Sequence, residues 1–269
     1  MIIAKYWPAT RWQAFGIHLA TSLSIGGLFA LATYFLWYPQ PLLALQGGLL
    51  VMGVLLGVDV VLGPLMTLLV FSPRKPQKEL RFDLAVIVSV QLAAFVYGGW
   101  VIYSERPQYL VFAQSQFFVV RGPESLGVPE DAVLEKSPRY GMFGPRVVYA
   151  VIPAEHVFNG SAVMAAIMGD PTFALDATTY RSFPHNLSAL QSEAIDAKEV
   201  LPELGDAPAE MARSAGIAVS DLSFFLVKGK AASGVAVLRQ QTGELLGIVN
   251  VDLLRKKDPI SAPESPGRT

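Results

Sequence analysis

The stretch LLGVDVVLGPLMTLLVF (residues 55–71) decides the fold, because it ends a long apolar run that begins at about Leu42. That run exceeds the roughly 20 residues that a helix needs to cross a bilayer. Its only charge is Asp59, and Pro64 within it removes a backbone hydrogen bond to the carbonyl of residue 60. We therefore expect a kinked transmembrane helix with a carboxyl group near mid-bilayer.

Two further apolar runs of sufficient length lie on either side of this segment. His18 is the only ionisable group in the first, and the last contains no charged residue. The chain as a whole is 52% hydrophobic and 16% charged, against about 25% charged residues in ordinary soluble domains. These features predict three transmembrane helices, at residues 12–37, 42–71 and 84–103.

The distribution of basic residues predicts the orientation of these helices. The connection before the second helix has no Lys or Arg, whereas the loop at residues 72–83 has four, and Lys5 and Arg11 precede the first helix. Cytoplasmic loops are enriched in Lys and Arg, so the N-terminus and loop 72–83 are expected in the cytoplasm. In a bacterial inner membrane, the C-terminal part then lies in the periplasm. The expected domains are residues 1–104 (transmembrane), 105–256 (periplasmic) and 257–269 (a disordered, Pro- and Ser-rich tail).

The periplasmic part has the pattern of an α+β domain. Segments rich in β-branched and aromatic residues predict strands, and segments with helical spacing of apolar residues predict helices between them. The last three strands read as an antiparallel meander, so the expected fold is three transmembrane α-helices followed by an α+β domain with an antiparallel sheet. Strands are expected at 109–120, 146–152, 224–230, 234–240 and 245–254, and helices at 156–169, 187–201 (ended by Pro202) and 207–215.

No combination of residues in the sequence indicates catalysis or metal binding. The chain has no cysteine and three histidines, without the spacing of a metal site, phosphate loop or nucleophile motif. We expect no enzymatic activity, no cofactor and no metal. The long basic runs of nucleic-acid-binding proteins are also absent, and nothing in the sequence specifies a homo-oligomer.

The candidate functional residues lie in the transmembrane segments. Ionisable residues in a bilayer are costly and usually face other helices or a wet cavity, and a GxxxG step lets a helix approach closely. Depth counting favours a hydrogen bond between Asp59 and Ser22, Ser24 or a bound water over a His18–Asp59 pair. Asp59 either joins the three helices or binds a partner or an ion, and both interpretations stay open. The partner-binding candidates are His18, Ser22, Gly53, Gly57, Asp59, Pro64 and Gln91.

A second group of candidates lies in the cytoplasmic loop, where charges gather at the start of the third helix. The group is either an orientation signal with ordinary helix capping or a docking surface at the lipid headgroups. Its members are Lys78, Glu79, Arg81 and Asp83.

Five segments together resemble the TfpX/TfpZ family of type IV pilin accessory proteins. They are RWQAFGIHLATSLSI (11–25), LWYPQPL (36–42), LLGVDVVLGPLMTLLVF (55–71), KELRFDLAVIVSVQLAAFVYG (78–98) and RPQYLVF (106–112). The resemblance implies an inner-membrane protein that binds the major pilin and modulates pilus assembly or dynamics, with the assembly machinery as a further candidate partner. Two alternatives remain: a polytopic membrane sensor, and a proton-coupled membrane protein that uses Asp59 and His18.

Overall fold

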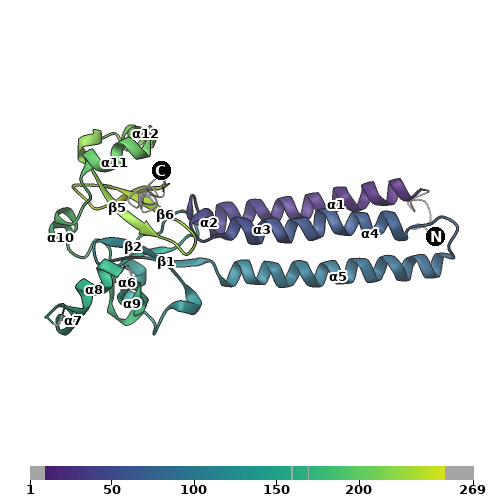
Figure 1. Ribbon diagram of the computed structural model, residues 1–269, viewed down its shortest axis with the longest axis horizontal. Coiled ribbons are helices and arrows are strands. Elements are labelled where there is room, and N and C mark those ends of the chain that lie inside the picture. Colours follow the sequence, from purple (N-terminus) through teal and green to yellow (C-terminus); the bar gives the residue numbers. More distant parts are fainter. Residues whose placement is uncertain (1–9, 159, 169, 252–269) are drawn as a thin grey trace, which may run out of the picture. The chain divides into compact units, whose positions relative to one another are not determined.

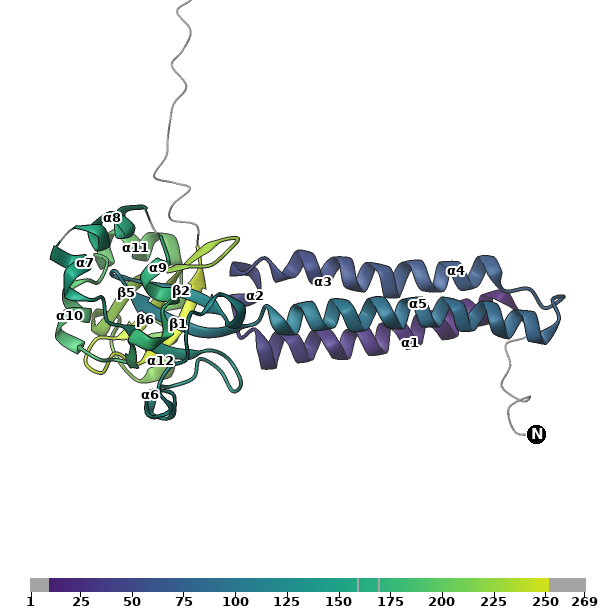
Figure 2. The ribbon, with the colours of Figure 1, turned by 90° about the horizontal axis from the view of Figure 1, so that it is seen from below.

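A computed structural model describes residues 10–158, 160–168 and 170–251 (Figures 1 and 2). Lys5 and the predicted tail at 257–269 lie outside the described residues. The chain forms two compact units, and each is described by itself. The first unit contains the chain up to Tyr109 together with residues 120–125 and 139–145, and the second contains residues 110–119, 126–138 and those from Arg146 onward.

The first unit contains three helices that are long and apolar enough to cross a membrane, as predicted: Arg11–Trp37, Gly48–Val70 and Gln77–Ser104. Two of them change from α- to π-helical geometry along their length. The elements are α1 (Arg11–Ala32), η2 (Thr33–Trp37), α2 (Leu42–Leu45), α3 (Gly48–Leu56), η3 (Gly57–Leu62), α4 (Gly63–Val70) and α5 (Gln77–Ser104).

The predicted limits of the second and third helices need correction. The second does not run unbroken from Leu42, because Gly47 adopts a left-handed conformation (φ 74°) and separates the short helix α2 from α3. The third apolar span, predicted from residue 84, belongs to a longer helix that begins at Gln77, so the predicted helix start among the charged residues 78–83 is confirmed. Hydropathy marks only the apolar part of a helix, and α5 continues past it through charged residues.

Two apolar clusters hold the three helices together, one toward each end of the unit. At one end, Ala14, Phe71 and Leu80 are buried against each other. At the other end, Phe29 of α1 contacts Phe95 of α5, with ring centroids 5.2 Å apart. The second cluster also includes Tyr38, Leu43, Met52, Leu55 and Ile102.

Tyr38 links the chain after η2 to the end of α5. Its hydroxyl donates a hydrogen bond of 2.9 Å to the carbonyl of Ile102. Burial raises the pKa of Tyr38 to about 12, so the phenol stays protonated at neutral pH and can donate this bond. The first and third helices are therefore joined directly at this end, and both lie alongside the second (Figures 1 and 2).

The second unit is built around a seven-stranded sheet with the order β4-β3-β1-β2-β5-β6-β7. The predicted antiparallel meander is confirmed for β5, β6 and β7. The sheet as a whole is mixed, because β2 pairs with β5 in parallel, and the prediction of an antiparallel sheet is wrong in this respect. The strands are β1 (Pro107–Ala113), β2 (Gln116–Arg121), β3 (Arg146–Ala150), β4 (Tyr180–Ser182), β5 (Leu222–Lys228), β6 (Ser233–Arg239) and β7 (Leu245–Asn250).

Both faces of the central strands are covered. Phe224 of β5 joins an apolar cluster with Val200 and Ala212 of the covering helices, whereas the adjacent Phe225 packs on the aromatic rings of Phe112 and Phe117. Successive side chains of a strand point to opposite faces, so this alternation places a core on each side of the sheet. Strands buried on both faces read as continuous apolar runs, as β5 and β6 do.

Two predicted helices of the second unit are each divided into two. The segment 156–169 forms α7 and α8 on either side of the positive-φ Gly160, and 187–201 forms α10 and α11 around an isolated bridge from Ile195 to Phe224. Pro202 lies inside α11 and does not end it. The helices are α6 (Asp131–Lys136), α7 (Ala154–Phe158), α8 (Ser161–Met168), α9 (Thr172–Leu175), α10 (Leu187–Ser192), α11 (Ala197–Leu204) and α12 (Ala207–Ala215), with short 3₁₀ turns at Gly122–Glu124, Ala177–Thr179 and Val219–Asp221.

Candidate functional site

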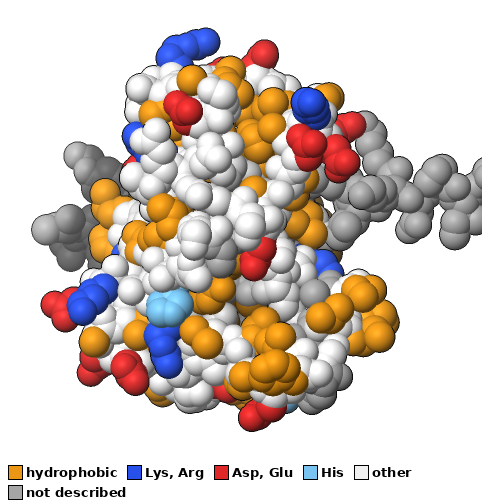
Figure 3. Space-filling model, turned by 90° about the vertical axis from the view of Figure 1, so that its left-hand side faces the viewer, with side chains coloured by type: hydrophobic (Ala, Val, Ile, Leu, Met, Phe, Trp, Pro, Cys, Tyr) orange, Lys and Arg blue, Asp and Glu red, His pale blue; other side chains and the backbone are white. Residues whose placement is uncertain are grey.

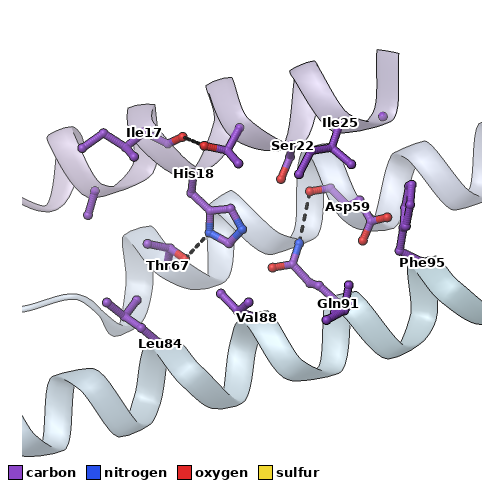
Figure 4. Close-up of a pocket in the computed structure, with 14 residues that line it drawn as sticks. Ile17, His18, Ser22, Ile25, Asp59, Thr67, Leu84, Val88, Gln91 and Phe95 are labelled. Atoms are coloured by element: carbon purple, nitrogen blue, oxygen red, sulfur yellow. Dashed lines mark hydrogen bonds between the residues drawn. The ribbon is translucent and has the colours of Figure 1, made fainter. Parts of the chain in front are cut away.

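A groove lies between α1 and α5, with η3 and α4 as its floor (Figure 4). It encloses about 480 Å³, and apolar side chains such as Ile25, Val88 and Phe95 form most of its walls. Between the two apolar clusters, it gathers the polar residues of all three helices. These are His18, Thr21, Ser22, Asp59, Thr67 and Gln91.

The floor of the groove is distorted by the π-helical segment η3. The Gly63 N–H donates to the carbonyl of Val58, five residues back, and not to that of Asp59. Pro64 has no N–H to offer the Asp59 carbonyl either. A freed backbone carbonyl in an apolar environment needs another donor. Gln91 of α5 supplies it, with its amide nitrogen 3.2 Å from the Asp59 carbonyl oxygen.

Gln91 reaches this carbonyl because residue 63 is a glycine. A β-carbon at Gly63 would collide with the Gln91 amide group. Pro64, Gly63 and Gln91 therefore determine this hydrogen bond together. The carbonyl that accepts it is that of Asp59, whereas the sequence indicated a freed carbonyl at residue 60. Of the two predicted candidates among these residues, Gln91 lines the groove, whereas Pro64 is buried in α4 and does not.

The Asp59 side chain is buried without a hydrogen-bond partner. The residue is 6% exposed, and neither carboxyl oxygen has a partner among the residues that the structure describes. The predicted bond to Ser22 or Ser24 is not formed: the Ser24 hydroxyl donates to the carbonyl of Ala20 in its own helix, at 2.8 Å. A serine bonded to its own helix backbone satisfies its hydroxyl locally, so it leaves Asp59 unpaired.

His18 pairs with Thr67 and not with Asp59. Its Nδ1 atom lies 2.6 Å from the Thr67 hydroxyl oxygen. The Gln91 side chain lies between the His18 ring and Asp59 (Figure 4). Sequence reasoning missed Thr67, although Asp59, Gly63 and Thr67 recur at four-residue intervals and so share one face of a helix.

The glycines of the three helices fall into two groups. A β-carbon at Gly26 would lie 2.8 Å from Leu56, and one at Gly98 would lie 2.7 Å from Leu55, so these glycines permit close packing within the unit. A β-carbon at Gly53 or Gly57 would meet nothing within 4 Å. The GxxxG step therefore packs against no described helix of this chain and remains an open surface.

The predicted charged group lies in the first two turns of α5. Lys78, Glu79 and Arg81 are exposed, and Asp83 forms a 2.9 Å salt bridge with Lys75 from the preceding connection. Exposed ion pairs contribute little to stability, about 0–1 kcal/mol. This group has the form of a charged helix surface, separate from the groove.

The second unit exposes an apolar surface that sequence reasoning did not single out. Charged and apolar side chains are interspersed on the face shown in Figure 3, where apolar side chains also gather in patches. The exposed apolar residues of α7 and α8 form what we call the α7–α8 surface. They are Val157, Phe158, Val163, Met164, Ile167 and Met168.

The chemistry of the groove is that of an apolar binding site. Within the described ranges, no cluster of three or more His, Cys, Asp or Glu residues could hold a metal ion. The groove presents apolar walls and one buried carboxyl group that lacks a donor. Such a site can accept an apolar segment that brings a hydrogen-bond donor.

Comparisons with known proteins give the family. Residues 8–47 match the family model described as fimbrial assembly protein FimB. Over 97 residues, 36% of this chain, the sequence is 39% identical to each of two proteins of Dichelobacter nodosus, the fimbrial assembly proteins of serogroup I and of serogroups C1 and C2. It is 37% identical over the same length to that of serogroup E1.

The matched region covers 74% of the serogroup C1 and C2 protein but 38% of the other two, so the chain matches well under half the length of these two relatives. No solved structure matches the chain. The chain belongs to the fimbrial assembly protein FimB family.

Proposed function

We propose that this protein is an inner-membrane accessory protein for type IV pili, of the TfpX/TfpZ kind, that binds the major pilin and modulates pilus assembly or dynamics. The family relationship supports the connection to pili. The observation that carries the binding role is the groove between α1 and α5, with an unpartnered buried carboxyl group on its floor. A binding and assembly role needs no catalytic residues.

The membrane placement rests on the three long apolar helices, whose outward faces are largely exposed. In this placement residues 1–104 form the transmembrane domain. The basic residues Arg74, Lys75, Lys78 and Arg81 mark the cytoplasmic side, and residues 105–256 form a periplasmic domain. Lipid then covers the exposed leucines and valines, which would otherwise form an apolar surface too large for a soluble monomer.

In this proposal the groove binds the apolar helix of a pilin that is still embedded in the membrane, before its assembly into the pilus. Helices associate in lipid through close packing and interhelical hydrogen bonds, since lipid tails are as apolar as leucine. The incoming helix packs on the apolar walls and donates a hydrogen bond to Asp59. His18 and Ser22 line its path along α1, and the open face at Gly53 and Gly57 offers a second surface for close approach.

The parts outside the membrane provide further contacts in this proposal. The α7–α8 surface contacts the periplasmic head of the pilin. The charged group at Lys78, Glu79, Arg81 and Asp83 docks on the pilus assembly machinery at the cytoplasmic headgroups. Proton coupling through His18 and Asp59 is the weaker alternative, because His18 is engaged by Thr67.

The direct test is co-purification from membranes. The full chain with an affinity tag is expected to retain the major pilin in mild detergent, in amounts well above those retained by an unrelated three-helix membrane protein. The charge-reversal variants Lys78→Glu and Arg81→Glu provide a matched control, since they lie away from the groove and should leave pilin retention unchanged. Recovery of the tagged protein without pilin would contradict the proposal.

A further inference from the structure

The loop at residues 139–145, RYGMFGP, is a preformed turn within the first unit. The backbone N–H of Tyr140 donates to the carbonyl of Pro145 at 2.9 Å, and a guanidinium nitrogen of Arg139 donates to the carbonyl of Gly144 at 3.0 Å. These two bonds close the loop on itself. Its conformation therefore does not depend on the residues at its tip.

The loop is attached to the connection between the first two apolar helices. The Tyr140 hydroxyl donates a hydrogen bond to the carbonyl of Gln40. A β-carbon at Gly141 would lie 2.9 Å from the Pro39 ring, and one at Gly144 would lie 2.6 Å from it. Gly141 also has a φ of 80°, which other residues rarely adopt. Two glycines thus let the loop lie directly on Pro39.

Between these glycines, the tip of the loop is apolar and exposed. Met142 is 75% exposed and Phe143 is 60% exposed, and no charged residue stands between Tyr140 and Pro145. Exposure of two large apolar side chains on a rigid loop is unfavourable, because transfer of either one from water to an apolar environment would lower the free energy. Phe143 and Met142 therefore need an apolar environment.

The surroundings of the attachment point identify that environment. Pro39 follows Trp37 and Tyr38, and the Trp37 ring contacts Tyr103 near the end of α5, at 5.1 Å between centroids. The Arg106 guanidinium carbon lies 3.8 Å from the centre of the Tyr103 ring. Tryptophan and tyrosine gather at membrane–water interfaces, and arginine there reaches the headgroups. The loop is thus attached at the level where the helices leave the bilayer.

We propose that loop 139–145 is a lipid-inserting loop, whose Met142 and Phe143 side chains enter the outer leaflet of the bilayer. The inference rests on the membrane placement proposed above and adds a second type of membrane contact to it. The occupant of the apolar tip is lipid acyl chain, and the glycine-bounded backbone stays at headgroup level. The chain between β3 and α6 is thereby anchored to the membrane surface at a point far in sequence from the three helices.

The absence of cysteine from the chain makes the test direct, because each single-cysteine variant carries one label. Full-length Phe143→Cys is labelled with a nitroxide and reconstituted in nanodiscs of phosphatidylethanolamine and phosphatidylglycerol. Its collisions with oxygen, which enters lipid, are compared with its collisions with a water-soluble nickel chelate. Leu69→Cys on α4 (77% exposed) provides the lipid reference, and Val128→Cys (78% exposed) provides the water reference.

The proposal predicts that the Phe143 label has an oxygen-to-nickel collision ratio several-fold above that of Val128 and closer to that of Leu69. A Phe143 ratio equal to that of Val128, with Leu69 in lipid, would overturn the loop proposal alone. If the Leu69 label is also open to the nickel chelate, the membrane placement fails, and the loop proposal fails with it. Phe143 is exposed, so its replacement should not disturb folding.

Discussion

The variant Asp59→Leu is expected to be more stable than the native protein and to retain at least tenfold less pilin. A buried polar group without a partner costs about 1–3 kcal/mol, and an apolar side chain of similar size removes that cost. The same change removes the acceptor that we propose for the incoming helix. A tenfold loss of binding corresponds to about 1.4 kcal/mol, close to the lower limit of the roughly 1.5–3 kcal/mol of a hydrogen bond to a charged group.

Thermal unfolding of the purified protein in detergent, together with pilin retention, measures both effects. Thr67→Val serves as the matched control. It removes the partner of His18 in the same groove, so it should lower stability slightly and leave pilin retention largely unchanged. A different outcome is expected if Asp59 joins the three helices of its own chain: Asp59→Leu would then unfold at a lower temperature. That result would indicate that Asp59 stabilises the three helices of its own chain.

The variant Gly26→Leu is expected to lower the stability of the three-helix unit by about 1–3 kcal/mol, the usual cost of overpacking. A β-carbon at this position would already lie 2.8 Å from Leu56, and the rest of a leucine side chain has no room between α1 and η3. The helices must move apart, which also distorts the groove floor at Asp59. We expect pilin retention to fall with stability.

Gly53→Leu is the matched control for this prediction, because a β-carbon at Gly53 would meet nothing within 4 Å beyond its own turn of the helix. Its stability should stay within about 0.5 kcal/mol of the native value, as for other surface substitutions. Loss of pilin retention in this variant, at native stability, would place the pilin on the face of Gly53 and Gly57. Equal destabilisation by both substitutions would contradict the close packing of α1 at Gly26.

The three apolar helices could be predicted from hydropathy, but their limits could not. Apolar runs of more than 20 residues are unambiguous, whereas Gln46 and Gly47 interrupt the second run too briefly to be noticed. Hydropathy places the third apolar span from residue 84, whereas the charges at 78–83 already indicate the helix start that α5 shows. Helices that continue into water keep their backbone hydrogen bonds while their side chains become polar.

The polar residues of the groove could be identified from their residue types in the sequence, but their hydrogen-bond partners could not. His18, Asp59 and Gln91 are conspicuous because polar side chains in apolar helices are rare. Their pairing depends on the π-helical segment before Pro64, which frees the Asp59 carbonyl and brings it within reach of Gln91. Counting residues along regular helices cannot reproduce that shift. Of the partners that it offered for Asp59, the two serines, Ser22 and Ser24, form no bond with the carboxyl group.

Strand pairs that are close in sequence could be predicted, whereas the pair that joins distant parts of the sequence could not. Strands β5 to β7 follow one another through short connections, so their antiparallel pairing follows from their order in the sequence. The parallel pair of β2 with β5 joins residues such as Phe117 and Val227, which more than a hundred positions separate. Nothing in either strand specifies that neighbour, because both are mostly apolar and are buried along most of their length.

Site-specific photocrosslinking in pilin-producing cells would locate the bound pilin helix. A benzophenone side chain is placed at Ser22 or Val88, which line the groove, and at Leu50 or Leu69, which are exposed on α3 and α4 outside the groove lining. We predict strong crosslinks to the major pilin from Ser22 and Val88, weaker ones from Leu50 and Leu69, and loss of the groove crosslinks in Asp59→Leu. Crosslinks of equal strength from all four positions, or none from the groove, would contradict a role of the groove in pilin binding.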